Sequence, residues 1–326
     1  MRIWKNGILG VVIGDALGCP VQFESRAMVA QHPVTGMRGH GTFNLPAGSW
    51  TDDSSLTLAL LESVRRKGAI DYTDIMENFV NWLDNGAFTP YGYAYDIGGA
   101  TMSAIQRYKR DHNPMLCGCR HESDNGNGSL MRIMPAVLYC FEKQWGDNYS
   151  ISIIHDVGGL THAHIRAKIA CGLYYFMAKH ILTGEGTLNE RLQAGLDEGF
   201  MFYDDYMEEL DLPFDAYIEQ KKNLTYYDRL RDLATLGALP EDRIRSSGYV
   251  VDTLEAAVWT LANTDSFEAA LLKAVNLGDD TDTVGAITGG LAGLYYGYDA
   301  IPEEWIAAIQ RREWIEGLCE FPQQEE

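Results

Sequence analysis

Basic residues are scarce in this sequence. The 326 residues include 26 lysines and arginines against 46 aspartates and glutamates, which leaves a formal net charge of −20. A surface of that charge repels the phosphate backbone of nucleic acids, so nucleic-acid binding is not expected. Hydrophobic residues make up 46% of the chain, which is too many for a disordered protein.

Long uncharged runs are also missing. The longest covers about residues 283–298, falls short of the roughly 20 residues that a membrane-spanning helix needs, and contains five glycines. We read it as a buried helix whose small residues allow close packing. The basic and then apolar residues 1–14 faintly suggest a signal peptide, but Asp15 interrupts the pattern and no cleavage site is clear. We therefore expect an N-terminal helix and no membrane association.

Cysteine is sparse and shows no repeated spacing. The six cysteines are most simply free thiols of a protein in the reducing cytoplasm. Cys117, Cys119 and His121 could contribute soft ligands to zinc, but no distant pair completes a set of four, so an ordinary loop is favoured.

Alternating β patterns are nearly absent, and the helical period dominates. We expect an all-α protein with about a dozen helices. The clearest helical segments are residues 54–67, 75–83, 99–110, 130–141, 164–182, 252–263, 266–276, 283–296 and 303–318. The acidic region 184–248 carries few motifs and is either a solvated face, which we favour, or an inserted lobe.

Two oxygen-rich clusters each precede an apolar helix. Residues 48–54 read GSWTDDS, and residues 278–285 read GDDTDTVG. Capping of the helix N-terminus accounts for one polar residue in each cluster. The additional carboxylates are not explained by capping, because adjacent carboxylates repel each other unless a positive group lies near them. Neither cluster has the ligand spacing of an EF-hand or the glycine-lysine of a phosphate-binding P-loop.

Taken together, the two clusters suggest one site. Carboxylate and hydroxyl oxygens without histidine or cysteine partners suit Mg²⁺ or Mn²⁺ rather than Zn²⁺. Four carboxylates with two hydroxyls are enough for a pair of metal ions, which can clamp a diol or activate a water.

A loop rich in small residues, 124–129 (DNGNGS), precedes the predicted helix 130–141. It could be a flexible loop with a serine cap, or it could let backbone N–H groups approach a phosphate. Its residues alone favour the first interpretation.

Several motifs, in order, make the sequence resemble the ADP-ribosylglycohydrolases over nearly the whole chain. They are residues 14–18 (GDALG), 49–53 (SWTDD), 125–132 (NGNGSLMR), 160–162 (LTH), 248–254 (GYVVDTL) and 276–283 (NLGDDTDT). The resemblance implies a single compact, orthogonal multi-helix domain over residues 1–326. It also implies a centre of two Mg²⁺ or Mn²⁺ ions and the cleavage of ADP-ribose from modified groups.

Individual residues match positions of that family. The implied metal ligands are Thr51, Asp52, Asp53, Asp280, Asp282 and Thr283. The implied substrate-binding residues are Glu24, Gly98, Gly99, Asn127, Gly128, Ser129, His162 and Tyr249, with Tyr95 as a further aromatic candidate. Asp279 replaces a glycine that is frequent in the family and is expected behind the ligands. Asp53 and Glu24 are the two candidates to take a proton from the attacking water.

The resemblance implies an ADP-ribosylated protein or a small ADP-ribose conjugate as the substrate. The motif pattern is closer to the bacterial arginine-linked type, and an acidic surface suits a cationic arginine side chain. Serine-linked ADP-ribose, O-acetyl-ADP-ribose, binding without catalysis, and phosphohydrolysis remain as alternatives.

Overall fold

The computed structural model describes residues 2–209 and 214–321, which form helices, short helical turns and no β-sheet. The all-α expectation is confirmed. The α-helices are α1 Arg2–Gly18, α2 Arg26–Val29, α3 Asp52–Lys67, α4 Tyr72–Asn85, α5 Gly99–Asp111, α6 Met134–Lys143, α7 Asp147–Gly159, α8 Ile165–Thr183, α9 Leu188–Glu209, α10 Phe214–Thr225, α11 Leu233–Gly237, α12 Val250–Ala262, α13 Phe267–Val275, α14 Thr281–Tyr296, α15 Glu303–Ala308 and α16 Arg312–Leu318.

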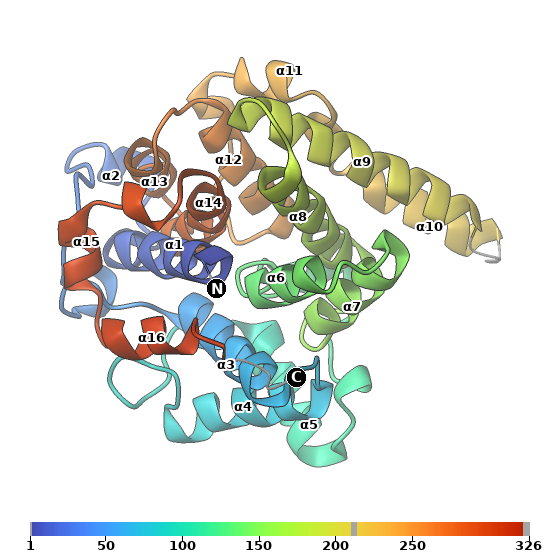
Figure 1. Ribbon diagram of the computed structural model, residues 1–326, viewed down its shortest axis with the longest axis horizontal. Coiled ribbons are helices and arrows are strands. Elements are labelled where there is room, and N and C mark those ends of the chain that lie inside the picture. Colours follow the sequence, from blue (N-terminus) through green and yellow to red (C-terminus); the bar gives the residue numbers. More distant parts are fainter. Residues whose placement is uncertain (1, 210–213, 322–326) are drawn as a thin grey trace.

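Helices α1 and α14 pack against each other in the centre of the molecule (Figure 1). Glycines on both helices bring the backbones into contact. A Cβ atom on Gly14 would lie 2.0 Å from the carbonyl oxygen of Gly285, and one on Gly10 would lie 2.1 Å from that of Gly289. The pairing shows that the helices run antiparallel. It confirms the prediction that the small residues of 283–298 allow close packing.

One predicted helix is broken. Residues 303–318 were expected as a single helix, but α15 ends at Ala308 and α16 begins at Arg312. The backbone N–H of Gln310 donates to the carbonyl of Gly48 at 3.1 Å, and its side chain donates to Ala47. These contacts with a distant turn replace helical hydrogen bonds, and Arg311 adopts a left-handed conformation with φ of 51°.

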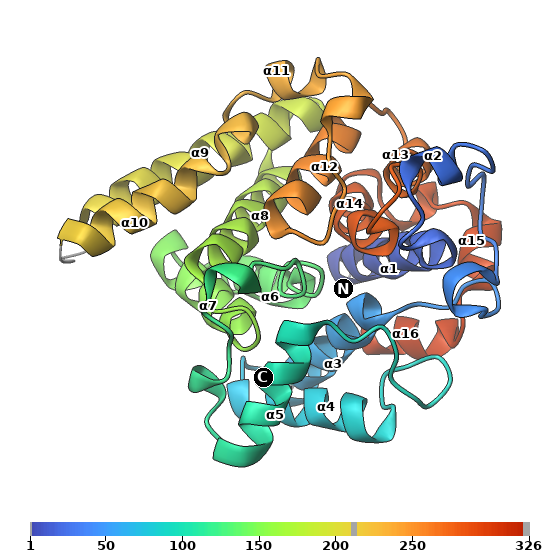
Figure 2. The ribbon, with the colours of Figure 1, turned by 180° about the vertical axis from the view of Figure 1, so that it is seen from behind.

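The acidic region 184–248 contains α9 and α10, which lie along each other and extend together from the body (Figures 1 and 2). Nearer the body, α9 packs against α8 and buries Leu192 and Leu196. The segment that joins α9 to α10 falls outside the described residues.

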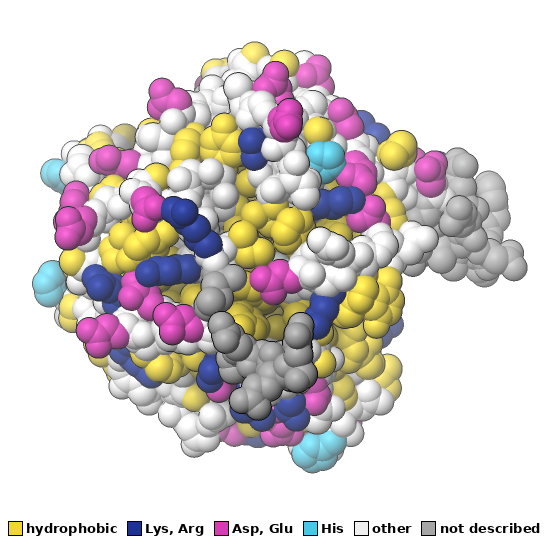
Figure 3. All heavy atoms as spheres, viewed as in Figure 1, with side chains coloured by type: hydrophobic (Ala, Val, Ile, Leu, Met, Phe, Trp, Pro, Cys, Tyr) yellow, Lys and Arg dark blue, Asp and Glu magenta, His cyan; other side chains and the backbone are white. Residues whose placement is uncertain are grey.

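On the face shown in Figure 3, acidic side chains are scattered among basic, polar and hydrophobic ones, without a broad basic patch among the coloured atoms. Within residues 2–209 and 214–321, no helix is both long and apolar enough to cross a bilayer. All six cysteines are buried free thiols. Cys117 donates to the carbonyl of Asn113 and Cys119 to that of Ala100.

Candidate active site

The two oxygen-rich clusters meet where the N-terminal ends of α3 and α14 reach the C-terminal end of α1. Thr281 Oγ1 donates to the carbonyl of Gly18 at 2.8 Å, and a Cβ on Gly18 would lie 2.4 Å from the backbone nitrogen of Asp282. The close packing of α1 on α14 therefore places the second cluster beside the first. The positive ends of two helix dipoles point to the same region, which favours negative charge there.

The carboxylate of Asp15, a residue of α1, caps the N-terminal end of α3. Its carboxylate accepts the backbone N–H groups of Thr51 and Ser54, both at 2.9 Å, and the Ser54 hydroxyl at 2.6 Å. Burial raises the pKa of Asp15 to about 7, although these donors act in the opposite direction. Because Asp15 supplies the cap, Asp52 and Asp53 in the first turn are not used for capping.

Buried oxygens from both clusters lie close together. Thr51 Oγ1 lies 3.3 Å from Asp53 Oδ2 and 3.2 Å from Asp282 Oδ2. Thr283 Oγ1 lies 3.4 Å from the same Asp53 oxygen. Asp280 lies beside them and accepts the Asn127 side-chain amide at 2.6 Å. The six implied metal ligands are thus contributed by two helix starts that are more than 220 residues apart in the chain.

The carboxylates of this cluster oppose each other's ionisation. Burial, and then the charges of neighbouring aspartates, raise the pKa values of Asp52, Asp53 and Asp282 well above the usual range for aspartate. The pKa values of Asp96 and Asp280 are raised too, chiefly by burial. Asp53 Oδ1 is buried without a hydrogen-bond partner.

The donor set fits a hard divalent cation. Carboxylate and hydroxyl oxygens are preferred ligands of Mg²⁺ and Mn²⁺, and a cation would offset both the repulsion and the unpartnered oxygen of Asp53. In the described residues no three acidic, histidine or cysteine side chains already converge as a ready-made cage. The hydroxyls of Thr51 and Thr283 lie between the carboxylates and are further oxygen donors of the same kind.

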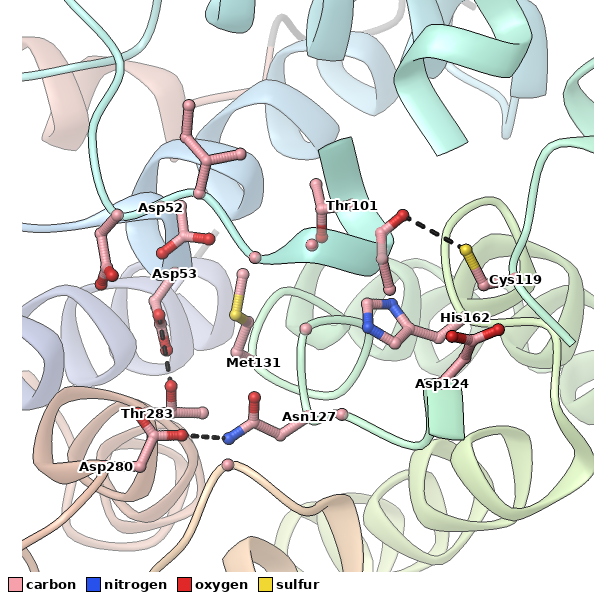
Figure 4. Close-up of a pocket in the computed structure, with 18 of the residues that line it drawn as sticks. Asp52, Asp53, Thr101, Cys119, Asp124, Asn127, Met131, His162, Asp280 and Thr283 are labelled. Carbon is pink, nitrogen blue, oxygen red and sulfur yellow. Dashed lines mark hydrogen bonds between the residues drawn. The ribbon is translucent and has the colours of Figure 1, made fainter. Parts of the chain in front are cut away.

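A cavity of about 660 Å³ opens on the acidic cluster. Figure 4 shows Asp52, Asp53, Asp280 and Thr283 on one side of it and Asp124, Cys119 and His162 on the other. Gly98, Gly99, Asn127 and Gly128 line it as well. The lining includes five aspartates and, among the described residues, no lysine or arginine.

The loop before α6 lies along this cavity. The prediction of a helix over 130–141 was wrong at its start, since α6 begins at Met134. The Asn127 carbonyl instead accepts N–H groups from both Leu130 and Met131 in a turn, and the Asn127 N–H donates to the carbonyl of Gly248. This turn presents Asn127 and Gly128 to the cavity.

His162 lies at the end of the cavity opposite Asp52, Asp53 and Asp280, on the same side as Asp124. Burial lowers its pKa to about 3. Its Nδ1 lies 2.9 Å from Thr161 Oγ1, which also accepts a hydrogen bond from Arg132 at 2.8 Å. Since the guanidinium can only donate, the Thr161 oxygen accepts from Arg132, and the same hydroxyl contacts Nδ1 of the neutral imidazole. Gly128 lies close to this ring, because a Cβ there would come within 2.8 Å of it.

Two buried histidines should make the free energy of unfolding depend on pH. Burial lowers the pKa of His155, like that of His162, to about 3. Between pH 6.5 and pH 3, each of these histidines takes up a proton in the unfolded chain, where its pKa is about 6.5, but stays neutral in the folded protein. Each therefore lowers the free energy of unfolding as the pH falls through this range. The His155→Gln variant lacks one of these groups. When the pH is lowered from 7 to 5, we expect its free energy of unfolding to rise by about 2 kcal/mol relative to that of the natural protein. Urea denaturation at both pH values measures this change, and a constant difference would contradict the burial argument.

Three predicted substrate-binding residues, Glu24, Ser129 and Tyr249, are not part of the cavity lining. Glu24 lies in a turn whose carbonyl accepts from Asp279, and its side chain is not part of the lining. Ser129 is buried, and its hydroxyl lies 3.7 Å from the Cys171 thiol. The half-buried Tyr249 lies outside the lining, with its ring centroid 5.8 Å from the Arg166 guanidinium carbon.

The remaining predicted residues include both buried and exposed ones. Thr51 and Asp282 are buried beneath the cavity floor. Tyr95 donates its hydroxyl to the carbonyl of Trp50. Asp279 is exposed, has φ of 61°, and is not directed into the cluster by any hydrogen bond of its carboxylate among the described residues.

Two acids of the site were missed as functional residues. Asp15 interrupts an apolar run and belongs to the motif 14–18, but no role was predicted for it. A single acid within a buried helix is itself a signal, because burying a carboxylate is costly. Asp96 lies in an irregular loop, where no helical period marks it. It accepts the Gln22 amide at 2.8 Å and lines the cavity.

Comparisons with known proteins identify relatives of this chain. The sequence model of the ADP-ribosylglycohydrolase family matches residues 4–325. An ADP-ribosylarginine hydrolase, Tri1, of Serratia proteamaculans is 32% identical over 97% of this chain and 77% of its own length. The ADP-ribosyl-[dinitrogen reductase] glycohydrolase of Rhodospirillum rubrum is 30% identical over 94% of this chain and 90% of its own.

A solved structure described as an ADP-ribosylglycohydrolase-related protein complex superposes with a TM-score of 0.74 at 32% identity. The match covers 98% of this chain and 95% of that one. Fold and sequence similarity both extend over nearly the whole chain, so this protein is an enzyme that belongs to the ADP-ribosylglycohydrolase family.

Proposed function

We propose that this enzyme is a divalent-metal-dependent hydrolase that releases ADP-ribose from arginine side chains. The observation that carries the proposal is the cluster of buried carboxylates at one end of the cavity, with no basic side chain in the described lining to balance it. The relatives named for ADP-ribosylarginine and for dinitrogen reductase support the linkage and a protein substrate.

The metal ions would be held by Thr51, Asp52, Asp53, Asp280, Asp282 and Thr283. Two Mg²⁺ or Mn²⁺ ions bound there would supply Lewis acidity toward the hydroxyls of the distal ribose. The carboxylates suit this role because a bound cation keeps them ionised despite their burial.

The rest of the cavity would hold the pyrophosphate without a basic side chain. Gly98 and Gly99 lie at the N-terminal end of α5, where helical N–H groups have no helical acceptor. His162 adds a neutral imidazole to the cavity lining. Donors of this kind bind phosphate oxygens while leaving the product ADP-ribose free to dissociate.

Hydrolysis joins a water oxygen to C1″ of the ribose and breaks the bond from C1″ to the arginine nitrogen. One water proton goes to the leaving guanidine, so ADP-ribose and unmodified arginine are the products. Of the two acids considered for orienting the water, Asp53 lines the cavity and Glu24 does not. We therefore assign this role to Asp53.

The proposal is tested by incubating the purified protein with a peptide ADP-ribosylated on a single arginine. Intact ADP-ribose and unmodified peptide are expected with Mg²⁺ or Mn²⁺, and no product is expected with EDTA. Readdition of the metal should restore the activity. Metal-independent release would contradict the assigned role of the six residues.

Other products would identify other reactions. AMP or inorganic phosphate would indicate a phosphohydrolase. Release only from a serine-linked peptide or from O-acetyl-ADP-ribose would refute the arginine linkage, whereas binding of ADP-ribose without release from any of these substrates would indicate a non-catalytic relative.

A further inference from the structure

An unbroken series of aromatic rings leads away from the acidic end of the cavity. It consists of Phe23, Phe43, Tyr95, Tyr93 and Tyr91, called here the aromatic strip. Successive ring centroids are 6.5, 5.4, 5.9 and 6.3 Å apart. Phe23 lines the cavity and is 66% exposed, and Tyr93 is 52% exposed.

The backbone holds Phe23 at the cavity in a conformation that this residue type rarely adopts. Its φ is 68°, and its N–H donates to the carbonyl of Asp279 at 2.6 Å. The N–H of Asp279, also at positive φ, donates back to Glu24 at 2.7 Å. A positive φ at a bulky residue lowers the stability of the fold, and an exposed ring does not offset this loss by packing. Backbone strain of this kind is common at ligand sites.

The loops that carry the strip are tied to the acidic site. Thr42, next to Phe43, donates to the carbonyl of Gln22 at 2.6 Å, and the Gln22 amide donates to Asp96 at 2.8 Å. Tyr95 donates its hydroxyl to the carbonyl of Trp50, which directly precedes Thr51 in the first cluster. The rings are therefore positioned by the same residues that form the acidic end.

The strip lies where the leaving group must emerge. If the acids and their metals hold the distal ribose, as in the proposed function on which this inference rests, the modified side chain is attached to C1″ of that same ribose. It must leave the cavity at its acidic end, past Phe23 and Asp96. The adenine lies at the other end of ADP-ribose, beyond the pyrophosphate and away from the acidic cluster.

The chemistry of this exit suits a guanidinium group. Aromatic faces attract cations, and the planar guanidinium stacks on them as well. Asp96 supplies a carboxylate beside Tyr95. The nearby Arg26 does not compete, because its guanidinium donates to the backbone carbonyls of residues 241, 244 and 277.

We propose that the aromatic strip binds the arginine side chain and adjoining peptide of the substrate, and that it selects cationic over neutral ADP-ribosyl linkages. Phe23 is the first ring of this subsite, and Tyr93 is the exposed ring further out. Neither is a catalytic residue in this proposal, and both act on binding of the leaving group.

The test compares Phe23→Leu and Tyr93→Leu, which keep apolar bulk but remove the aromatic face. For an ADP-ribosylarginine peptide we expect KM to rise about 2- to 5-fold for each variant, with kcat nearly unchanged. For O-acetyl-ADP-ribose, which has no cation, KM should not change. The inhibition constant of free ADP-ribose should also stay the same. Tyr149→Leu is the matched control, since Tyr149 is 57% exposed on α7 and remote from the cavity lining.

The outcomes separate this inference from the proposed function. If the natural protein does not cleave the arginine-linked peptide, the proposed function fails together with the inference. If the natural protein cleaves it but the two variants leave its KM unchanged, only the aromatic strip is refuted. An equal rise in KM for all substrates, or weaker inhibition by free ADP-ribose, would show that the rings contact ADP-ribose itself and would also refute it.

Discussion

Replacing Asp280 by asparagine is expected to lower kcat/KM for an ADP-ribosylarginine peptide by roughly 10³-fold. The substitution keeps the shape of the side chain and can keep the 2.6 Å hydrogen bond from Asn127, so it removes little except the negative charge. A divalent cation at the acidic cluster depends on that charge.

The same variant should behave in an unusual way in thermal denaturation. Asp280 is crowded by other acids, and burial raises its pKa. Without metal, the neutral amide relieves repulsion, so the variant should melt at the same temperature as the natural protein or at a higher one. With Mg²⁺, the natural protein should gain stability through binding, and the variant should lose most of this gain.

Asp279→Asn is the control for both measurements. Asp279 is the adjacent acid, but it is exposed, and asparagine tolerates its φ of 61°. Its activity and its response to Mg²⁺ should match those of the natural protein. Equal loss in both variants would mean that total charge, rather than the position of Asp280, controls metal binding.

Replacing Gly14 by alanine should destabilise the fold by at least about 3 kcal/mol. The added methyl group would lie 2.0 Å from the carbonyl oxygen of Gly285, which is backbone within a packed helix and cannot rotate away. The two helices would have to separate along their length. Urea denaturation measures the loss, and failure to obtain soluble folded protein is the extreme of the same result.

Gly317→Ala provides the comparison. Gly317 is an exposed residue of α16, and no atom lies within 4 Å of the position of its Cβ. Alanine favours the helix over glycine by about 1 kcal/mol, so stability should be unchanged or slightly higher. Similar urea midpoints for the two variants would refute the steric argument at Gly14.

The features predictable from the sequence are those encoded locally. Helical periods identify α3, α8, α12 and α14, and the surplus of acids at two helix starts identifies most of the acidic cluster. Five glycines in 283–298 likewise indicate the close packing of α14, because few other structures need so many small residues in one apolar segment.

The features that were missed depend on distant contacts. Asp15 acts through Thr51, 36 residues away in the chain, and a sequence does not show which helix start it will cap. The break between α15 and α16 depends on a hydrogen bond to Gly48, and the delayed start of α6 depends on one from Asn127 to Gly248. Local propensity favours helix in both segments until these partners are present.

The packing of α1 on α14 also determines when activity can first appear during synthesis. The first acidic cluster and its cap by Asp15 can form early, but Asp280, Asp282 and Thr283 leave the ribosome only after most of the chain has been made. Until then, the glycine-lined side of α1 has no partner, and the first acidic cluster lacks its second half. Contacts between residues so far apart are slow to form, so we expect the docking of α14 to be a late step in folding. The appearance of metal-dependent activity would then report the completion of the whole fold.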